Sequence, residues 1–274
     1  MSLVANHPLQ SNWPAPPDRD KQTPLRARTL RERLKFCTLT GIDESVPLDA
    51  LLEMRRRHPY VEFGVLYSTK QQGIGRYPSL LHISKLALAA AENKGLNLAL
   101  HVCGSAVGDL LAERGQVTEL AQHFPRIQIN MVAGAHDLQF VCGLLDRMSH
   151  QTVITQHNNA NKGLWRSLSH KANHAVLFDE SGGKGLEPEA WESPLDIVSE
   201  KPPFVAHNPV CGYAGGLGPD NIAQHLRLVG KVTQGKPFWI DLESSLRNSA
   251  DRFDLSIAQR CLNQVESVLR GTES

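Results

Sequence analysis

The sequence is poor in cysteine, nearly balanced in charge and free of long hydrophobic runs. Its five cysteines (Cys37, Cys103, Cys142, Cys211 and Cys261) are far apart and form no CxxC pair, so neither a disulfide framework nor a structural zinc site is favoured. The scattered set fits buried thiols in a reducing compartment. No apolar run approaches the roughly 20 residues that cross a membrane, and polar residues interrupt any signal pattern at the amino terminus. We therefore expect a cytoplasmic protein that does not contact membranes.

The net charge of +1 over 274 residues implies no polyelectrolyte partner, so nucleic acid is not expected. With 41% hydrophobic residues, the chain is long enough for one large core or two modest ones. Residues 1–30 are polar and proline-rich, and we expect them to form a flexible tail. No linker interrupts residues 31–274, so we expect them to form one domain, as a monomer or a homodimer.

Apolar segments that suit strands alternate along the chain with segments that suit helices. The strand candidates are residues 34–39, 61–67, 96–102, 126–132, 152–155, 175–178, a segment of ill-defined start leading into residue 210, and 237–242. The helix candidates between and after them include residues 48–57, 80–93, 106–123, 137–148, 162–170 and 255–269. Such alternation predicts parallel strands with crossover helices, and eight units over about 240 residues fit a closed (β/α)8 TIM barrel. A doubly wound open sheet is the alternative, although no GxGxxG follows the first strand.

Residues 210–222 hold four glycines within seven positions and then a Pro-Asp-Asn that opens an amphipathic segment with Ile222, Leu226 and Val229. This pattern predicts a strand, a glycine turn and a helix. Glycines let backbone amides approach a ligand closely, and a helix amino terminus adds partial positive charge. A phosphate or another anion is therefore the expected guest, with a simple chain reversal as the alternative.

Polar and titratable residues gather where the predicted strands end, which is the position of the active site in a barrel. They are Cys37, Arg76, His101, Cys103, Gln128, Asn130, Gln156, His157, Asn158, Asp179, Asp241, Glu243, Ser244 and Ser245. Such a set favours an enzyme. A thiolate at Cys37 and a carboxylic acid at Asp179 would face each other across the mouth as base and acid. The alternatives are a buried, inert Cys37 and an Asp179 that caps a helix or pairs with Lys184.

Six short motifs stand in order along residues 34–269. They are Lys35-Phe-Cys-Thr38, Ile74-Gly-Arg-Tyr-Pro-Ser79, Ile127-Gln-Ile-Asn130, Asp179 followed by Gly182-Gly-Lys-Gly185, Ala214-Gly-Gly-Leu-Gly-Pro-Asp-Asn221, and Asp241-Leu-Glu-Ser-Ser245. Together they resemble phosphoribosylanthranilate isomerase, a (β/α)8 enzyme of tryptophan biosynthesis. The corresponding family motifs are Lys-Ile-Cys-Gly, Ser-Pro-Arg-Tyr, Val-Gln-Leu-His, Asp with Gly-Gly-Thr-Gly, Ala-Gly-Gly-Leu-x-Pro-Glu-Asn, and Asp-Val-Ser-Ser-Gly.

The resemblance implies an Amadori rearrangement of a phosphorylated aminosugar without metal or cofactor. Asp179 would protonate the ring oxygen, and Cys37 would take the C2 proton. The phosphate would lie on Gly215, Gly216, Ser244 and Ser245, while Arg76 would hold the anthranilate carboxylate. Asp241 would orient the substrate, and Gln128 would contact it.

The sequence departs from the family at several of these positions. Asn130 replaces the histidine of the fourth strand, Thr38 replaces the glycine after the cysteine, and Ser245 replaces the last glycine of the phosphate loop, beside Glu243. A divergent member with another substrate is therefore expected. Two further alternatives stay open. One is a lyase or aldolase with Lys162 or Lys184 as Schiff base, and the other is a silent ligand-binding barrel. A metal site at His101, Cys103 and Cys37 lacks clear further ligands.

Overall fold

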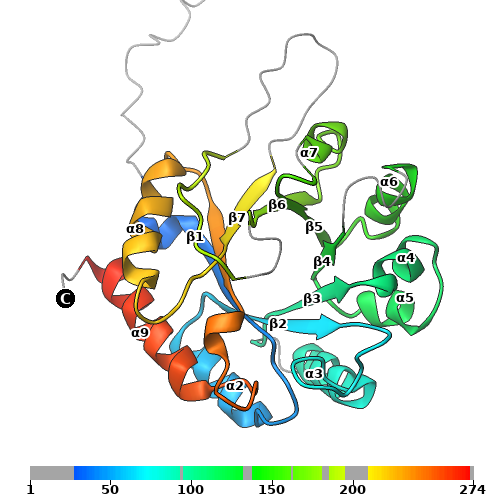
Figure 1. Ribbon diagram of the computed structural model, residues 1–274, viewed down its shortest axis with the longest axis horizontal. Helices are drawn as coiled ribbons and strands as arrows, with labels where there is room; N and C mark the ends of the chain where they lie inside the picture. The colour runs from blue at the N-terminus through cyan, green and yellow to red at the C-terminus, as the bar shows by residue number, and fades with distance from the viewer. Residues whose placement is uncertain are drawn as a thin grey trace, which may run out of the picture.

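Eight parallel strands follow one another around a closed barrel, and helices surround it (Figure 1). The computed structural model describes residues 28–92, 95–131, 138–161, 163–180, 185–194 and 209–271. The first strand pairs with the last, Thr38 lying beside Asp241, so the ring has no open edge. This closure confirms the predicted (β/α)8 barrel and excludes the open sheet.

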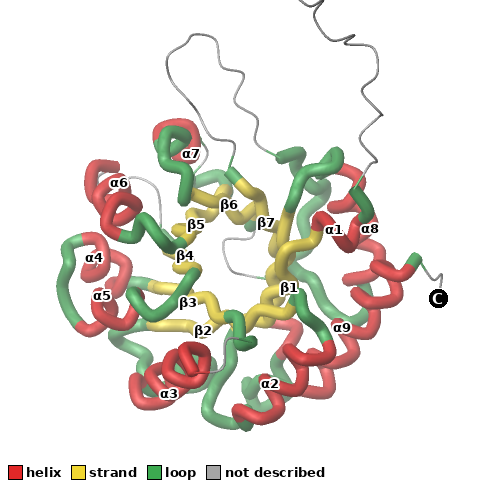
Figure 2. The backbone as a smooth tube through the Cα atoms, turned by 180° about the vertical axis from the view of Figure 1, so that it is seen from behind, coloured by secondary structure: helices red, strands yellow, loops and turns green. Residues whose placement is uncertain are grey.

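The elements alternate in the expected order. The strands are β1 (Leu34–Thr40), β2 (Val61–Tyr67), β3 (Leu98–Cys103), β4 (Arg126–Asn130), β5 (Thr152–His157), β6 (His174–Phe178), β7 (Val210–Ala214) and β8 (Phe238–Leu242). The helices are α1 (Leu30–Arg33), α2 (Leu48–Arg57), α3 (Leu80–Glu92), α4 (Ser105–Leu111), α5 (Gln116–Ala121), α6 (Leu138–Arg147), α7 (Leu164–Ser167), α8 (Ile222–Val232) and α9 (Leu255–Arg270), with a 3₁₀ turn η1 (Ser244–Leu246). Figure 2 shows the ring of strands inside the ring of helices.

The helix expected over residues 106–123 is two helices. It breaks between Leu111 and Gln116, where Glu113 and Gly115 have positive φ angles of 57° and 70°. A glycine tolerates this conformation without a steric penalty, so α5 starts in a new direction. The helix expected over residues 162–170 is shorter, because only Leu164–Ser167 is helical among the described residues.

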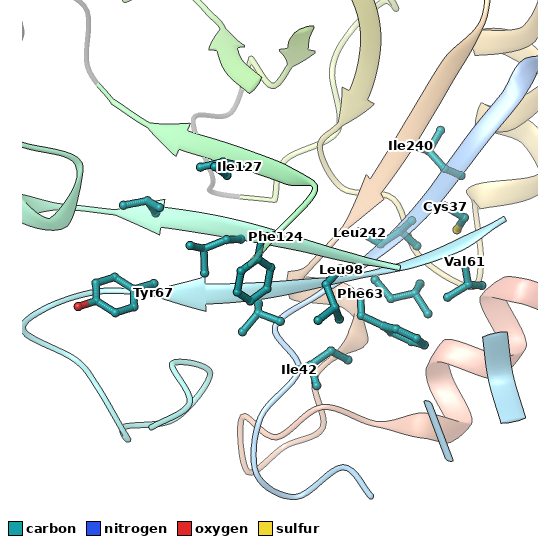
Figure 3. Close-up of a cluster of buried hydrophobic side chains, with 14 of the residues drawn as sticks. Cys37, Ile42, Val61, Phe63, Tyr67, Leu98, Phe124, Ile127, Ile240 and Leu242 are labelled. Atoms are coloured by element: carbon teal, nitrogen blue, oxygen red, sulfur yellow. The ribbon is translucent and has the colours of Figure 1, made fainter. Parts of the chain in front are cut away.

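Two apolar layers hold the barrel, one between strands and helices and one inside the ring. The outer layer includes Cys37, Leu39 and, from α9, Leu262, and Figure 3 draws Cys37 in this cluster with Val61 and Leu242. The inner layer contains Ile154, Ala175, Leu177 and Trp239, with Phe36 and Ala214 packed against it. Because strand side chains alternate between faces, Phe36 and Thr38 point inward while Cys37 points outward.

The amino-terminal end of the barrel interior is closed by a buried ion pair between two aromatic rings. Arg126 Nη1 lies 2.7 Å from Glu62 Oε1, and Thr38 Oγ1 donates to the same oxygen at 2.8 Å. The Arg126 guanidinium sits 4.6 Å from the ring centres of both Phe36 and Trp239. The barrel interior is therefore filled by a packed plug below the mouth.

The expected flexible tail covers residues 1–30, of which residues 1–27 lie outside the described residues. At the start of the described chain, Thr29 and Glu32 form a capping box that begins α1. In addition, Arg33 Nη1 donates to the Gly230 carbonyl of α8 at 2.9 Å. None of the helices in the described segments is long and apolar enough to span a membrane.

Candidate active site

A cavity of about 330 Å³ opens at the carboxyl ends of the strands. Its lining comes from six strands, β3 to β8, and the loops that follow them. The described lining residues are His101, Gln128, Asn130, Gln156, Leu177, Asp179, Gly185, Ala214, Gly215, Gly216, Leu217, Asp241, Leu242, Glu243, Ser244 and Ser245. The predicted site residues Gln128, Asp179 and Asp241 are thus brought together, as are the four predicted phosphate-binding residues.

Asp241 on β8 is a buried carboxyl group of the cavity, at 7% exposure. Burial raises its pKa well above the usual value of an aspartate, and the negative charges of Glu243 and Glu62 raise it further. The hydrogen bond from Thr40 Oγ1 to Asp241 Oδ1, 2.8 Å long, acts in the opposite direction without cancelling the effect of burial. Asp241 can therefore keep its proton at a pH where an exposed aspartate is ionised.

His101 on β3 lies beside Asp241, with its Nε2 atom 3.8 Å from Asp241 Oδ2. Burial lowers the pKa of His101 to about 3, and the positive charge of Arg126 contributes. The imidazole is therefore neutral near pH 7. The pair therefore contributes a neutral ring beside a carboxyl group whose ionisation is disfavoured by burial.

Asp179 follows β6 directly and lines the same cavity. It is 5% exposed, and its backbone amide donates to the His157 carbonyl at 3.2 Å. Gln156 Nε2 donates to Asp179 Oδ2 at 3.2 Å. Two carboxyl groups with different surroundings thus occupy one cavity, the arrangement that separates an acid from a base.

The glycine turn between β7 and α8 forms one side of the cavity. Gly215 and Gly216 have φ of 119° and 60°, and a Cβ on either would lie 2.7 Å from the backbone of residues 186–187. Asn221 ties the turn together, because its Oδ1 accepts from Gly218 N at 2.8 Å and its Nδ2 donates to the Gly216 carbonyl at 2.9 Å. The turn thus needs glycine for both its conformation and its close approach.

The two serines of the predicted phosphate site lie on η1, next to this turn. Ser244 is exposed and faces Gly185, where an added Cβ would lie 3.1 Å from Ser244 Oγ. Ser245 Oγ donates to the Leu217 carbonyl. Hence the Ser245 hydroxyl holds the glycine turn to η1, while Ser244 is the serine whose side chain is open to a ligand.

Arg76, expected to bind a substrate carboxylate, does not line the cavity. Its Nη1 lies 2.8 Å from Glu243 Oε1, and its Nη2 lies 2.8 Å from Asp251 Oδ1. Both nitrogens face carboxylates of the protein itself, so the expected role is corrected. The same pairing partly compensates the negative charge of Glu243, a residue that in the sequence lies beside the predicted phosphate loop.

Cys37 does not reach the cavity either, which corrects its expected place at the mouth. The first strand continues past it to Thr40, and Cys37 is fully buried in the layer against the helices. Burial raises the pKa of its thiol well above the usual range, with smaller contributions from Cys261 and Asp241. An outward, protonated thiol cannot face Asp179, and Thr40 is the β1 residue that reaches the site.

Several neighbours of Asp241 and Asp179 were not assigned a role from the sequence. Thr40, His101 and Gln156 each contact one of the two carboxyl groups. Their positions at strand ends are visible in the sequence, but their contacts depend on which face of each strand turns inward. Lys162 and Lys184 lie outside the described residues. Within the described segments, no three His, Cys, Asp or Glu side chains are grouped to hold a metal ion.

Comparisons with known proteins find likeness in structure but not in sequence. No family model matches the chain, and no curated protein matches it. Phosphoribosylanthranilate isomerase from Thermotoga maritima has a TM-score of 0.52 at 14% identity, covering 85% of this chain and all of that one, 100%. TrpF from Jonesia denitrificans has a TM-score of 0.52 at 16% identity, with 85% and 97% covered.

The enzyme from Thermus thermophilus gives the same TM-score, 0.52, at 16% identity, and covers 85% of this chain and 99% of its own. At such identities the comparison shows that the fold is similar, and the activity has to be inferred from the chemistry of the site. The chain thus has a (β/α)8 barrel that resembles phosphoribosylanthranilate isomerase in fold, at 14% to 16% sequence identity to these enzymes.

Proposed function

We propose that the protein is an isomerase that converts a phosphorylated aldose derivative, such as a glycosylamine, into the corresponding ketose derivative. The observation that carries the proposal is the buried Asp241, whose pKa is raised, in one cavity with Asp179. An isomerase of this kind needs an acid and a base on one substrate and no external oxidant. Two carboxyl groups with different surroundings meet that need.

The proposed reaction has two proton transfers. Asp241 donates its proton to the ring oxygen, the bond between this oxygen and C1 breaks, and the nitrogen lone pair forms a C1–N double bond. Asp179, as carboxylate, then removes the C2 proton, and the electron pair of that bond moves to give an enolamine. Tautomerisation of the enolamine gives the aminoketose, so no atom is gained or lost apart from exchanged protons. These roles reverse the expectation that Asp179 is the acid, and they leave Cys37 without a role.

The glycine turn is the proposed phosphate site. Gly215, Gly216, Gly185 and Ser244 lie together on one side of the cavity, and backbone amides at such turns bind phosphate in many barrels. One phosphoribosylanthranilate isomerase structure, with a TM-score of 0.51 and 14% identity to this chain, contains a reduced deoxyribulose 5-phosphate derivative. This likeness supports the choice of a phosphorylated sugar as the substrate class.

The test uses two assays. In the first, NMR measures exchange of the C2 proton in D2O with ribose 5-phosphate as substrate, alone and with ammonia. In the second, turnover of phosphoribosylanthranilate is measured by the loss of its fluorescence. We expect turnover of at least one substrate and a loss of at least about 10²-fold in Asp241→Asn and Asp179→Asn, as for an acid or base. Cys37→Ser is the control and should keep most of the activity. An inert wild type would refute the proposal, and a Cys37→Ser variant as impaired as the aspartate variants would refute the assigned roles.

A further inference from the structure

We infer that the reacting end of the substrate is hydroxyl-rich and carries neither a carboxylate nor an aryl ring. This inference rests on the proposed function and narrows its substrate class. It follows from three observations: the polarity of the side chains that line the cavity, their charge, and the pairing of Arg76 with carboxylates of the protein.

The side chains around Asp241 and Asp179 are mostly small polar groups. Gln128, Asn130 and Gln156 each offer an amide donor and an acceptor, and His101 offers a neutral ring with one donor and one acceptor. Sugar hydroxyl groups, which both donate and accept, match this set. Among the described lining residues the apolar ones are aliphatic and none is aromatic, so a substrate aryl ring would meet polar groups instead of a stacking partner.

The charge of the cavity opposes a carboxylate. Besides Asp241, whose ionisation is disfavoured, its described lining includes the acidic residues Asp179 and Glu243 but no lysine or arginine. A substrate carboxylate would lose its hydration there without gaining a cation, which is costly. Its presence near Asp241 would also disfavour ionisation of that residue after proton transfer.

Arg76 is the arginine that the sequence resemblance assigned to a substrate carboxylate. In the structure its guanidinium is already paired with carboxylates of the protein. Both of its terminal nitrogens contact carboxylates, one at Glu243 and one at Asp251, each at 2.8 Å. To bind a substrate carboxylate, Arg76 would have to leave Glu243, whose own charge would then face the substrate. Glu243 is therefore the specificity-determining residue, because it holds Arg76 at the rim and contributes negative charge to the cavity.

The experiment compares two unreactive ligands by calorimetry with the full-length protein. Ribitol 5-phosphate carries hydroxyl groups only, while reduced 1-(o-carboxyphenylamino)-1-deoxyribulose 5-phosphate adds a carboxylated ring to a five-carbon phosphate chain. We expect ribitol 5-phosphate to bind the wild type at least about tenfold more tightly, the factor for one lost favourable contact. Equal or tighter binding of the carboxylated ligand overturns the inference and leaves the proposed isomerase intact. Binding of neither ligand overturns the proposed function together with the inference.

Two variants separate the role of Glu243 from a general change of charge. Glu243→Gln removes the carboxylate that faces the cavity, and Asp251→Asn removes the other partner of Arg76 away from the cavity. We expect only Glu243→Gln to improve binding of the carboxylated ligand, by about three- to fivefold for a partly exposed charge pair. Equal effects of the two variants would overturn the assignment of Glu243. Lys184→Met should not weaken binding of the carboxylated ligand. A clear loss of its affinity in this variant would show that the cavity does supply a cation.

Discussion

Asp241 and His101 lie side by side in the buried end of the cavity, and burial acts on both in the same sense by disfavouring charge. For Asp241 this means a raised pKa, and for His101 a pKa lowered to about 3. The His101 imidazole is therefore uncharged near pH 7, and the ionised form of Asp241 is disfavoured beside it. An acid that is already protonated needs no neighbouring cation to do its work.

Asp241 should make the stability of the protein depend on pH in a direction unusual for an aspartate. Its folded pKa is raised, so above the unfolded value of about 3.9 the unfolded chain has lost a proton that the folded chain keeps. Stability then falls as pH rises through this window. Asp241→Asn should therefore be more stable than the wild type near pH 7, with the difference vanishing below about pH 4, as urea unfolding at both pH values would measure.

The histidine does not confuse this comparison. Because the pKa of His101 is lowered on folding, the protein loses stability as pH falls below the pKa of an unfolded histidine, about 6.5. This loss occurs in the wild type and in the variant alike. The difference between the two proteins therefore isolates Asp241. If Asp241→Asn is destabilised equally at pH 4 and pH 7, Asp241 is not held in its protonated form.

The contrast between Cys37 and Thr40 shows where sequence-based prediction of the site ends. The motif around Cys37 placed a strand correctly, but β1 is buried at most positions and its alternation of polar and apolar residues is interrupted between Phe36 and Cys37. Strands of a parallel sheet covered on both faces commonly lack such alternation. Which residues turned inward was therefore not decided by the pattern, and a shift of one residue moves a side chain to the other face.

The turn between β7 and α8 is the element that the sequence described best. Its glycines, the Pro-Asp-Asn that follows and the start of α8 all lie where the pattern predicted them. In contrast, the contact of the turn with residues 186–187 was not foreseen, because it joins segments separated by a long connection. The glycines determine the local conformation of the turn, whereas the segment that packs against them is determined only by the folded barrel.

Gly216→Ala should weaken binding of ribitol 5-phosphate. The new Cβ would lie 2.7 Å from Glu187 N in a residue with φ of 60°, so the turn or its covering segment must move. The matched control is Gly235→Ala, which also has a left-handed φ, 85°, but meets nothing within 4 Å. Both variants should lose about 1–2 kcal/mol of stability from the backbone conformation, but only Gly216→Ala should raise the dissociation constant, by about tenfold or more.

Calorimetry and urea unfolding of the two variants would provide both numbers. If Gly235→Ala weakens the ligand as much as Gly216→Ala, the effect comes from general destabilisation, and the glycine turn loses its assigned place in binding. If neither variant changes the dissociation constant, the phosphate lies elsewhere in the cavity.

The barrel as a whole divides along its axis into a plug and a mouth. Arg126, Glu62, Phe36 and Trp239 fill the amino-terminal end, while carboxyl groups and amides fill the carboxyl end. The order of eight strands and the closed ring were predictable from alternation and length, since few folds accommodate that pattern. The plug and the pairing of Arg76 were not, because they depend on contacts between residues distant in the sequence.

Arg126→Met should destabilise the barrel by about 3–5 kcal/mol, because Glu62 would remain buried as an unpaired charge. The control is the double variant Arg126→Met with Glu62→Gln, which removes both charges and should recover most of the loss. Urea unfolding of the three proteins gives the comparison. A double variant as unstable as the single one would mean that packing of the guanidinium against Phe36 and Trp239, rather than the ion pair, stabilises the plug.

The protonation state of Asp241 decides whether the cavity can donate a proton, and carbon NMR measures it. The protein is labelled with 13C at its aspartate carboxyl groups, titrated, and compared with Asp241→Asn to assign the signal. The raised pKa predicts one carboxyl signal that stays protonated well above pH 4, where ordinary aspartates have ionised, and that is missing from the variant. If every aspartate signal titrates near pH 4, Asp241 is ionised at neutral pH, and the acid on which the proposed isomerisation depends is absent.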